Sequence, residues 1–164
     1  MKALKPLLQS LNNNVGLPNT AAHNTKGEIM RFIFCLDDKN GMMFNSRRQS
    51  QDKILRERIL NMTKGYRLFM SEYSAKQFEA NDNIIVSNSY LEEATENDFC
   101  FIEDGEFSID SASEIIIYRW NRHYPSDRKF DIDLNTKDFK LYHSEDFVGS
   151  SHEKITEEKY KKGL

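Results

Sequence analysis

Residues 37–52 contain the kinds of side chain with which proteins commonly bind a small anion. Their sequence, DDKNGMMFNSRRQSQD, sets two adjacent arginines among amide, hydroxyl and carboxylate groups. Paired arginines offer bidentate hydrogen bonds to a phosphate or carboxylate, and the start of a following helix adds a favourable dipole. We therefore expect a small anionic or nucleotide-like ligand here. The candidate residues are Asn40, Asn45, Arg47, Arg48 and Gln49 for ligand binding and Asp52 for catalysis.

The same stretch also has a purely structural interpretation. Lys39, Asn40 and Gly41 are typical of a tight turn, the apolar residues at 42–44 would then cover the core, and the arginines would be solvated. The sequence leaves both interpretations open.

A second polar string, GSSHEK at residues 149–154, contains no apolar residue to bury. His152 is a candidate general base, oriented by Glu153 or by an acid distant in sequence, and Ser151 is a candidate ligand contact. Alternatively, the string is a loop in which Ser151 caps a terminal helix. No Ser-His-Asp triad is predicted, because triads are recognised by geometry and not by spacing.

Nucleic acid is a weaker candidate partner. Residues 120–125, WNRHYP, mix aromatic and basic side chains, and aromatic platforms beside arginines can stack bases. A strand that leaves the core through a turn at Pro125 explains the string equally well. The net charge of −3 gives the chain no general attraction to nucleic acid or to an anionic membrane.

The elements that would position these residues alternate between strands and helices. The continuous apolar run at 31–36 is typical of a central strand. Further strands are expected at 66–70, 83–87, 99–102, 114–120 and 139–143, and helices after Ser50, Ser71 and Ser89. This alternation predicts a three-layer α/β fold, with a mostly parallel sheet and antiparallel edge strands. Such sheets bind ligands outside the carboxyl ends of their strands, where residues 37–48 would emerge.

The two ends of the chain differ in character from this middle part. Residues 1–29 have turn and loop composition, so we expect a flexible leader or upstream extension before a single α/β domain at 30–164. The tail after Glu153 fits either an edge strand or a helix, and its charge run is typical of a solvated surface.

Cysteine usage and hydropathy favour the cytoplasm. Cys35 and Cys100 both lie in apolar runs, a context that suits buried free thiols better than a disulfide. No apolar run approaches the roughly 18 residues of a membrane-spanning helix, so we expect no membrane partner.

The order of the expected elements resembles that of the dihydrofolate reductases. DDKNGM at 37–42 resembles the mobile loop that follows the family's first strand, and Asp52 stands close to the family's substrate-binding acid. The strings LFM at 68–70, NIIVS at 83–87 and FDID at 130–133 are similar to later parts of its sheet. The resemblance implies a dihydrofolate reductase-like fold and, as one alternative, a divergent oxidoreductase.

Two departures from the family's pattern concern the cofactor NADPH. The family has a Gly-Arg pair after the second strand, where this chain has Ser71 and Glu72, and a Gly-Gly pair after the fifth, where it has Glu103 and Asp104. Backbone amides bind a pyrophosphate only where no bulky or negative side chain blocks the approach. Two unit charges about 4 Å apart interact by about 4 kcal/mol at an effective dielectric near 20, so exchanging Arg for Glu reverses a large attraction. We therefore expect no NADPH cofactor of the usual kind.

Three further strings, NGMMFN at 40–45, RRQSQD at 47–52 and GSSHEKIT at 149–156, are similar to those of small bacterial proteins that often carry the label ribonuclease Z. That family binds two zinc ions through a compact His-x-His-x-Asp-His cluster. This chain has only His23, His123, His143 and His152, which are too dispersed for such a cluster, so no metal site of that type is predicted.

The sequence thus favours an anion-binding domain and leaves three alternatives open. They are a divergent reductase, a ribonuclease-like RNA-processing enzyme, and a module that serves protein interactions.

Overall fold

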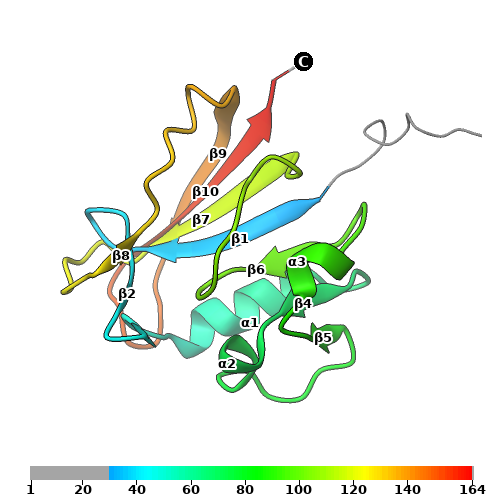
Figure 1. The fold of residues 1–164 in the computed structure, drawn as a ribbon. Helices are drawn as coiled ribbons and strands as arrows, with labels where there is room; N and C mark the ends of the chain where they lie inside the picture. The colour runs from blue at the N-terminus through cyan, green and yellow to red at the C-terminus, as the bar shows by residue number, and fades with distance from the viewer. Residues whose placement is uncertain (1–29, 164) are drawn as a thin grey trace, which may run out of the picture.

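A seven-stranded sheet forms the centre of the protein in a computed structural model that describes residues 30–163 (Figure 1). In spatial order the strands are β5 (Ile84–Val86), β4 (Leu68–Met70), β6 (Phe99–Phe101), β1 (Arg31–Leu36), β7 (Glu114–Arg119), β10 (Ile155–Lys162) and β9 (Phe139–Phe147). The strands from β5 to β7 are parallel, whereas β10 runs antiparallel to both β7 and β9. The predicted mostly parallel sheet with antiparallel strands at one edge is confirmed.

The sheet separates two layers of core, because successive side chains of a strand point to opposite faces. The helices that cover it are α1 (Lys53–Met62), α2 (Glu72–Ala75) and α3 (Tyr90–Glu93). On one face, Ile33 of β1 packs in the same cluster as Leu55 and Ile59 of α1. On the other face, Phe34 belongs to a cluster that includes Tyr90 of α3. Because β1 is buried on both faces, its sequence is a continuous apolar run.

A small second sheet lies just beyond the end of β1 (Figure 1). It consists of β3 (Arg47–Arg48), β2 (Gly41–Phe44) and β8 (Arg128–Lys129), in that spatial order. Asn45 and Ser46 join β2 to β3 with φ angles of 53° and 59°, the left-handed conformation that a two-residue type I′ hairpin turn requires. Much of the stretch expected to be a loop is therefore a β-hairpin.

The helix starts were predicted with mixed success. Ser71 caps α2 as expected, because its side chain accepts a hydrogen bond from the Ser74 backbone N–H. Asp52, and not Ser50, caps α1, accepting from the Leu55 N–H at 3.0 Å, and Ser50 is left free to contact another element. A helix does follow Ser89, as expected, but the Ser89 side chain makes no cap bond to α3.

The tail forms a strand, and it does not lie at the edge. β10 inserts between β7 and β9, with Thr156 opposite Arg119. Since β10 runs antiparallel to β7, its first residues lie at the carboxyl end of the parallel strands. Residues 149–154 therefore lie at the carboxyl ends of the parallel strands, where residues 37–52 also emerge.

Other expectations concern the ends of the chain, the cysteines and the membrane. The predicted leader at 1–29 lies outside the described residues. Cys35 and Cys100 are both free thiols, as expected, although only Cys100 is fully buried and Cys35 is half-buried. Within residues 30–163 no helix has the length and apolar character needed to cross a membrane.

Candidate functional site

Asp52 and His152, the two predicted catalytic residues, meet at the carboxyl edge of the sheet. His152 Nδ1 lies 3.1 Å from Asp52 Oδ2, and both side chains are almost completely buried. The other ring nitrogen, Nε2, lies 3.1 Å from both Ser50 Oγ and the Tyr124 hydroxyl. We call Ser50, Asp52, Tyr124 and His152 the buried cluster.

Asp52 is surrounded by hydrogen-bond donors. The backbone N–H groups of Ser150 and Ser151 donate to its carboxylate at 3.0 and 2.8 Å, in addition to the Leu55 N–H of the helix cap. Although burial opposes ionisation, these donors and His152 hold the pKa of Asp52 well below its ordinary value. Asp52 is therefore an ionised acceptor, and the Nδ1 atom of His152 carries the shared hydrogen.

Close packing fixes His152 on its remaining sides. Its ring stacks on Trp120 with a centroid separation of 4.5 Å, and its backbone carbonyl accepts from the Gly149 N–H at 2.9 Å. In the tautomer whose Nδ1 donates to Asp52, Nε2 is the acceptor for the hydroxyl of either Ser50 or Tyr124. These contacts hold the ring in a single orientation.

Ser50, His152 and Asp52 are linked by hydrogen bonds in the same order as the serine, histidine and aspartate of a catalytic triad. A nucleophilic serine also needs room for a substrate carbonyl. The cavity that Ser50 lines has a volume of about 10 Å³, which is roughly the space of a single water molecule. The triad connectivity therefore lacks space for a substrate in this conformation, and Tyr124 competes with Ser50 for Nε2.

Arg48 is committed to an internal ion pair. Its guanidinium bonds Glu103 through Nε at 3.1 Å and through Nη2 at 3.2 Å, and it lies 4.4 Å from the centre of the Tyr73 ring. Glu103 also accepts from Ser74 Oγ at 2.8 Å and from Gln77 at 3.2 Å. The ion pair ties the β2–β3 hairpin to the end of β6.

Arg47, unlike Arg48, is not part of an internal ion pair in the described part of the chain. Within residues 30–163 its guanidinium makes no hydrogen bond or ion pair, and it lines a cavity of about 430 Å³. The full lining is Phe44, Asn45, Arg47, Arg48, Gln49, Tyr124 and Pro125. Four predicted ligand-binding residues therefore share one cavity with Tyr124 of the buried cluster.

The other two predicted contacts, Asn40 and Ser151, do not line this cavity. Asn40 adopts a turn conformation with φ of 63° and accepts a hydrogen bond from Arg119 at 2.6 Å. Ser151 Oγ lies 3.2 Å from Asp52 Oδ2 and 3.1 Å from the backbone carbonyl of Gln51, so its single hydrogen serves one of these acceptors at a time. Ser151 therefore supports Asp52 of the buried cluster, whereas Asn40 is held by Arg119 at the end of β7.

Sequence reasoning missed Asp37, which organises the hairpin. Its carboxylate accepts from the backbone N–H groups of Gly41 and Tyr124 at 2.7 and 3.1 Å and from Gln49 Nε2 at 3.0 Å. Burial opposes ionisation, but these bonds lower the pKa of Asp37. Gly41 fits because a Cβ there would lie only 2.5 Å from Gln49 Nε2. An acid placed directly between a strand and a tight turn was a usable signal.

Comparison with solved structures shows what the fold is. A dihydrofolate reductase from Enterococcus faecalis, solved in complex with NADP(H) and RAB-propyl, matches with a TM-score of 0.59. The match covers 83% of this chain and 97% of that chain at 9% identity. This chain has a dihydrofolate reductase-like fold. No protein-family model matches the chain, and no curated protein does, so the ribonuclease Z label has no support.

The matched reductase was solved with NADP(H), and this chain departs from the reductase pattern at two places that carry carboxylates. Ser71, which caps α2, donates its hydroxyl to Asp104 at 2.8 Å. Glu103 fills the end of β6 together with Arg48. Glu103 and Asp104, which follow β6, are therefore both held by hydrogen bonds within the protein, and their negative charge opposes the binding of a phosphate beside them.

Proposed function

We propose that this protein binds a small anionic, nucleotide-like ligand in the cavity beside Arg47. The observation that carries the proposal is the contrast between the two arginines of β3. Arg48 is neutralised by Glu103, whereas Arg47 has no partner among residues 30–163 and faces a cavity of about 430 Å³. Small-molecule sites commonly have volumes of about 300–1,000 Å³.

The other residues that line the cavity suit the planar, uncharged part of such a ligand. Phe44 is an aromatic residue with 41% of its surface exposed, and Tyr124 and Pro125 add further flat surfaces. Aromatic rings can stack on a base or another planar group. Asn45 and Gln49 contribute amides that can orient polar atoms. The cavity thus combines one charge with planar contacts.

Asp52 and His152 do not line this cavity, but they contact it indirectly, through the hydrogen bond between His152 and Tyr124. The Tyr124 hydroxyl donates to His152 Nε2 when Nδ1 carries the hydrogen shared with Asp52. If Tyr124 takes up a proton from a ligand atom, it passes its own hydroxyl proton to His152 Nε2, and the ionised Asp52 at Nδ1 stabilises the imidazolium that results. In this proposal His152 and Asp52 are positioning residues that act through Tyr124.

The test is a binding experiment with defined probes. Adenosine 5′-monophosphate, adenosine and inorganic phosphate are titrated while the melting temperature is followed. A ligand at a hundred times its Kd stabilises the protein by about 2.7 kcal/mol. We expect the monophosphate to bind more tightly than either part, and Arg47→Ala to weaken it at least about tenfold, the loss of roughly one charge-assisted bond.

Arg56→Ala is the matched control, because Arg56 lies on α1 and contacts Gln51. It should leave the affinity within about twofold, a change well below one hydrogen bond. Undiminished binding to Arg47→Ala, or an equal loss in Arg56→Ala, would contradict the proposed site. NADPH is included as a further probe, and strong stabilisation by it would favour the divergent reductase instead.

A further inference from the structure

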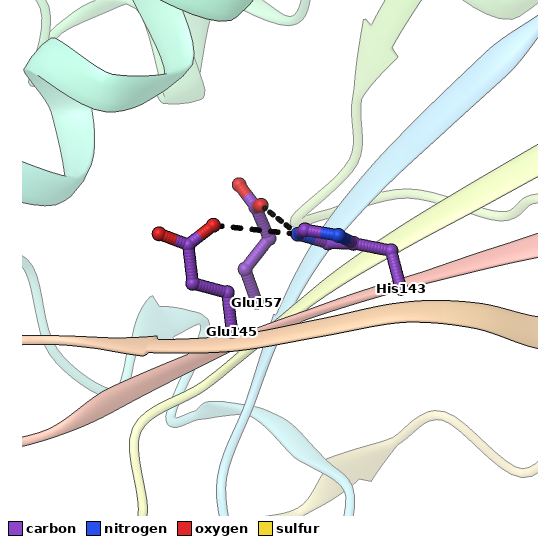
Figure 2. A group of neighbouring side chains, drawn as sticks. All are labelled: His143, Glu145 and Glu157. Carbon is purple, nitrogen blue, oxygen red and sulfur yellow. Dashed lines mark hydrogen bonds and ion pairs between the residues drawn. The ribbon is translucent and has the colours of Figure 1, made fainter.

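A second histidine–carboxylate group lies on the antiparallel strands at the sheet's edge (Figure 2). His143 and Glu145 occupy alternate positions of β9 and therefore share a face, and Glu157 of β10 stands directly opposite Glu145. Figure 2 shows the three side chains converging, with dashed lines from one ring nitrogen of His143 to both carboxylates. We call these three residues the open cluster.

The ligand atoms of the open cluster already have the spacing of a metal site. His143 Nε2 lies 3.1 Å from Glu157 Oε1 and 3.4 Å from Glu145 Oε1, and all three atoms lie within 4.8 Å of one another. Around a tetrahedral zinc ion with bonds of about 2.0–2.1 Å, neighbouring ligand atoms are about 3.3 Å apart. Little movement is needed to place a cation between them.

Arg58 of α1 now supplies the positive charge that the two carboxylates need. It bonds Glu145 Oε1 through Nη2 at 2.9 Å and Glu157 Oε2 through Nε at 3.1 Å. Like charges directly opposite each other on two strands repel, so the pair requires such a counter-charge. Lys159, in register with His143, adds a second cation on the same strand pair.

Glu157 is held so that one oxygen faces His143. Its Oε2 accepts from Tyr118 at 2.8 Å and from Arg58 Nε, whereas Oε1 is directed to His143 and also accepts a longer bond from Arg58 Nη2, at 3.4 Å. Bonds of this kind from outside the ligand set orient a ligand and support metal sites in general. Arg58 can therefore keep its Nε bond to Glu157 Oε2 while its Nη2 group leaves Glu145 Oε1 and Glu157 Oε1.

We propose that His143, Glu145 and Glu157 bind Zn²⁺, which displaces the Nη2 group of Arg58 from Glu145 and from Glu157 Oε1. One imidazole and two carboxylates form a ligand set that zinc accepts, and three protein ligands leave a position for water. His143 and Glu145 are 36% and 49% exposed, so an ion reaches the cluster from solvent. This proposal is independent of the ligand cavity at Arg47.

The test is calorimetric titration of the full chain with zinc chloride at neutral pH. The unmodified protein should bind one ion, and His143→Ala and Glu145→Gln should each weaken binding at least about tenfold, because each removes a ligand. Arg58→Met should bind zinc more tightly, because the competing cation is gone. His123→Ala, an exposed histidine outside the cluster, is the control and should change nothing.

Three outcomes would overturn the proposal. They are no zinc uptake by the unmodified chain, uptake that survives His143→Ala, and unchanged or weaker uptake by a folded Arg58→Met protein. If Arg58→Met fails to fold, Glu145→Gln decides the question, because Glu145 is half exposed and its replacement should leave the fold intact.

Discussion

The buried cluster and the open cluster join the same two chemical groups in different surroundings. In the buried cluster the His152 and Asp52 side chains are 2% and 0% exposed, and backbone N–H groups supply most of the donors to the acid. In the open cluster His143 and Glu145 are partly exposed, and the long side chain of Arg58 supplies the counter-charge.

The difference shows how burial determines what a histidine–carboxylate pair can do. A carboxylate can be buried only if hydrogen bonds replace the water that it loses. Backbone donors cannot move away, so the geometry around Asp52 is fixed and suits the orientation of neighbouring groups. A side-chain cation such as Arg58 can exchange, so the open cluster can accept a different cation.

Replacing Asp52 should have the largest effect on stability. Asp52→Ala leaves the N–H groups of Ser150, Ser151 and Leu55 without an acceptor and removes the partner of a buried histidine. Breaking a buried charged pair costs about 3–5 kcal/mol, and we expect a loss in this range from urea unfolding. Glu57→Ala, an exposed acid on the same helix, is the control and should change stability by less than about 0.5 kcal/mol. A small loss in Asp52→Ala would mean that the cluster contributes little to the fold.

Gly149→Ala tests the packing of the buried cluster without removing any of its polar groups. A Cβ at Gly149 would lie 2.4 Å from Asp52 Oδ2, closer than van der Waals contact allows. Overpacking of this kind typically costs about 1–3 kcal/mol. The same measurement on a Gly149→Ala/Asp52→Ala double variant should show a smaller added cost, because the clashing carboxylate is gone. Strict additivity of the two changes would contradict this contact.

The fold was predictable because its strands carry strong local signals. The continuous run of β1 and the Ser71 cap each follow from burial or from hydrogen-bonding rules. The tail was ambiguous, since its alternating charges suit a helix or a strand. Its Glu157 is buried, against the expectation of a solvated charge run, because Arg58 and Tyr118 satisfy its carboxylate. Partners from distant elements cannot be read from local sequence.

The candidate site was predictable in its residue types more than in their roles. Arg47 and Arg48 are adjacent and chemically identical, yet only the position of Glu103 decides which of them is neutralised. Asp52 and His152 were both selected, but their contact depends on the antiparallel insertion of β10. Tyr124 was missed as an individual residue because its role depends on reaching His152 across the fold.

The pH dependence of stability should distinguish the buried acid from an ordinary one. The pKa of Asp52 is lower in the folded than in the unfolded chain, so its contribution is complete above the unfolded value of about 4 and is lost as the pH falls below it. Asp52→Asn should therefore lose less stability than the unmodified protein between about pH 4 and pH 2. One carboxylate contributes a slope of at most about 1.4 kcal/mol per pH unit. Equal slopes for the two proteins would show that Asp52 titrates normally.

Glu145→Gln should have the smallest effect on stability without metal. Glu145 is 49% exposed and faces Arg58, which keeps Glu157 as a partner after the substitution. Exposed ion pairs contribute about 0–1 kcal/mol, and removing one of two opposed acids also relieves repulsion. We expect a change below about 1 kcal/mol in urea unfolding with a chelator present.

Glu157→Gln is the companion variant within the same cluster. Glu157 is 4% exposed and accepts from both Tyr118 and Arg58, so its loss should exceed that of Glu145. Equal losses for the two variants would mean that burial does not set the energetic difference between the clusters. A larger loss of stability for Glu157→Gln would mean that burial fixes Glu157 as it fixes Asp52. Only His143 and Glu145, the exposed residues of the open cluster, would then be free to exchange partners.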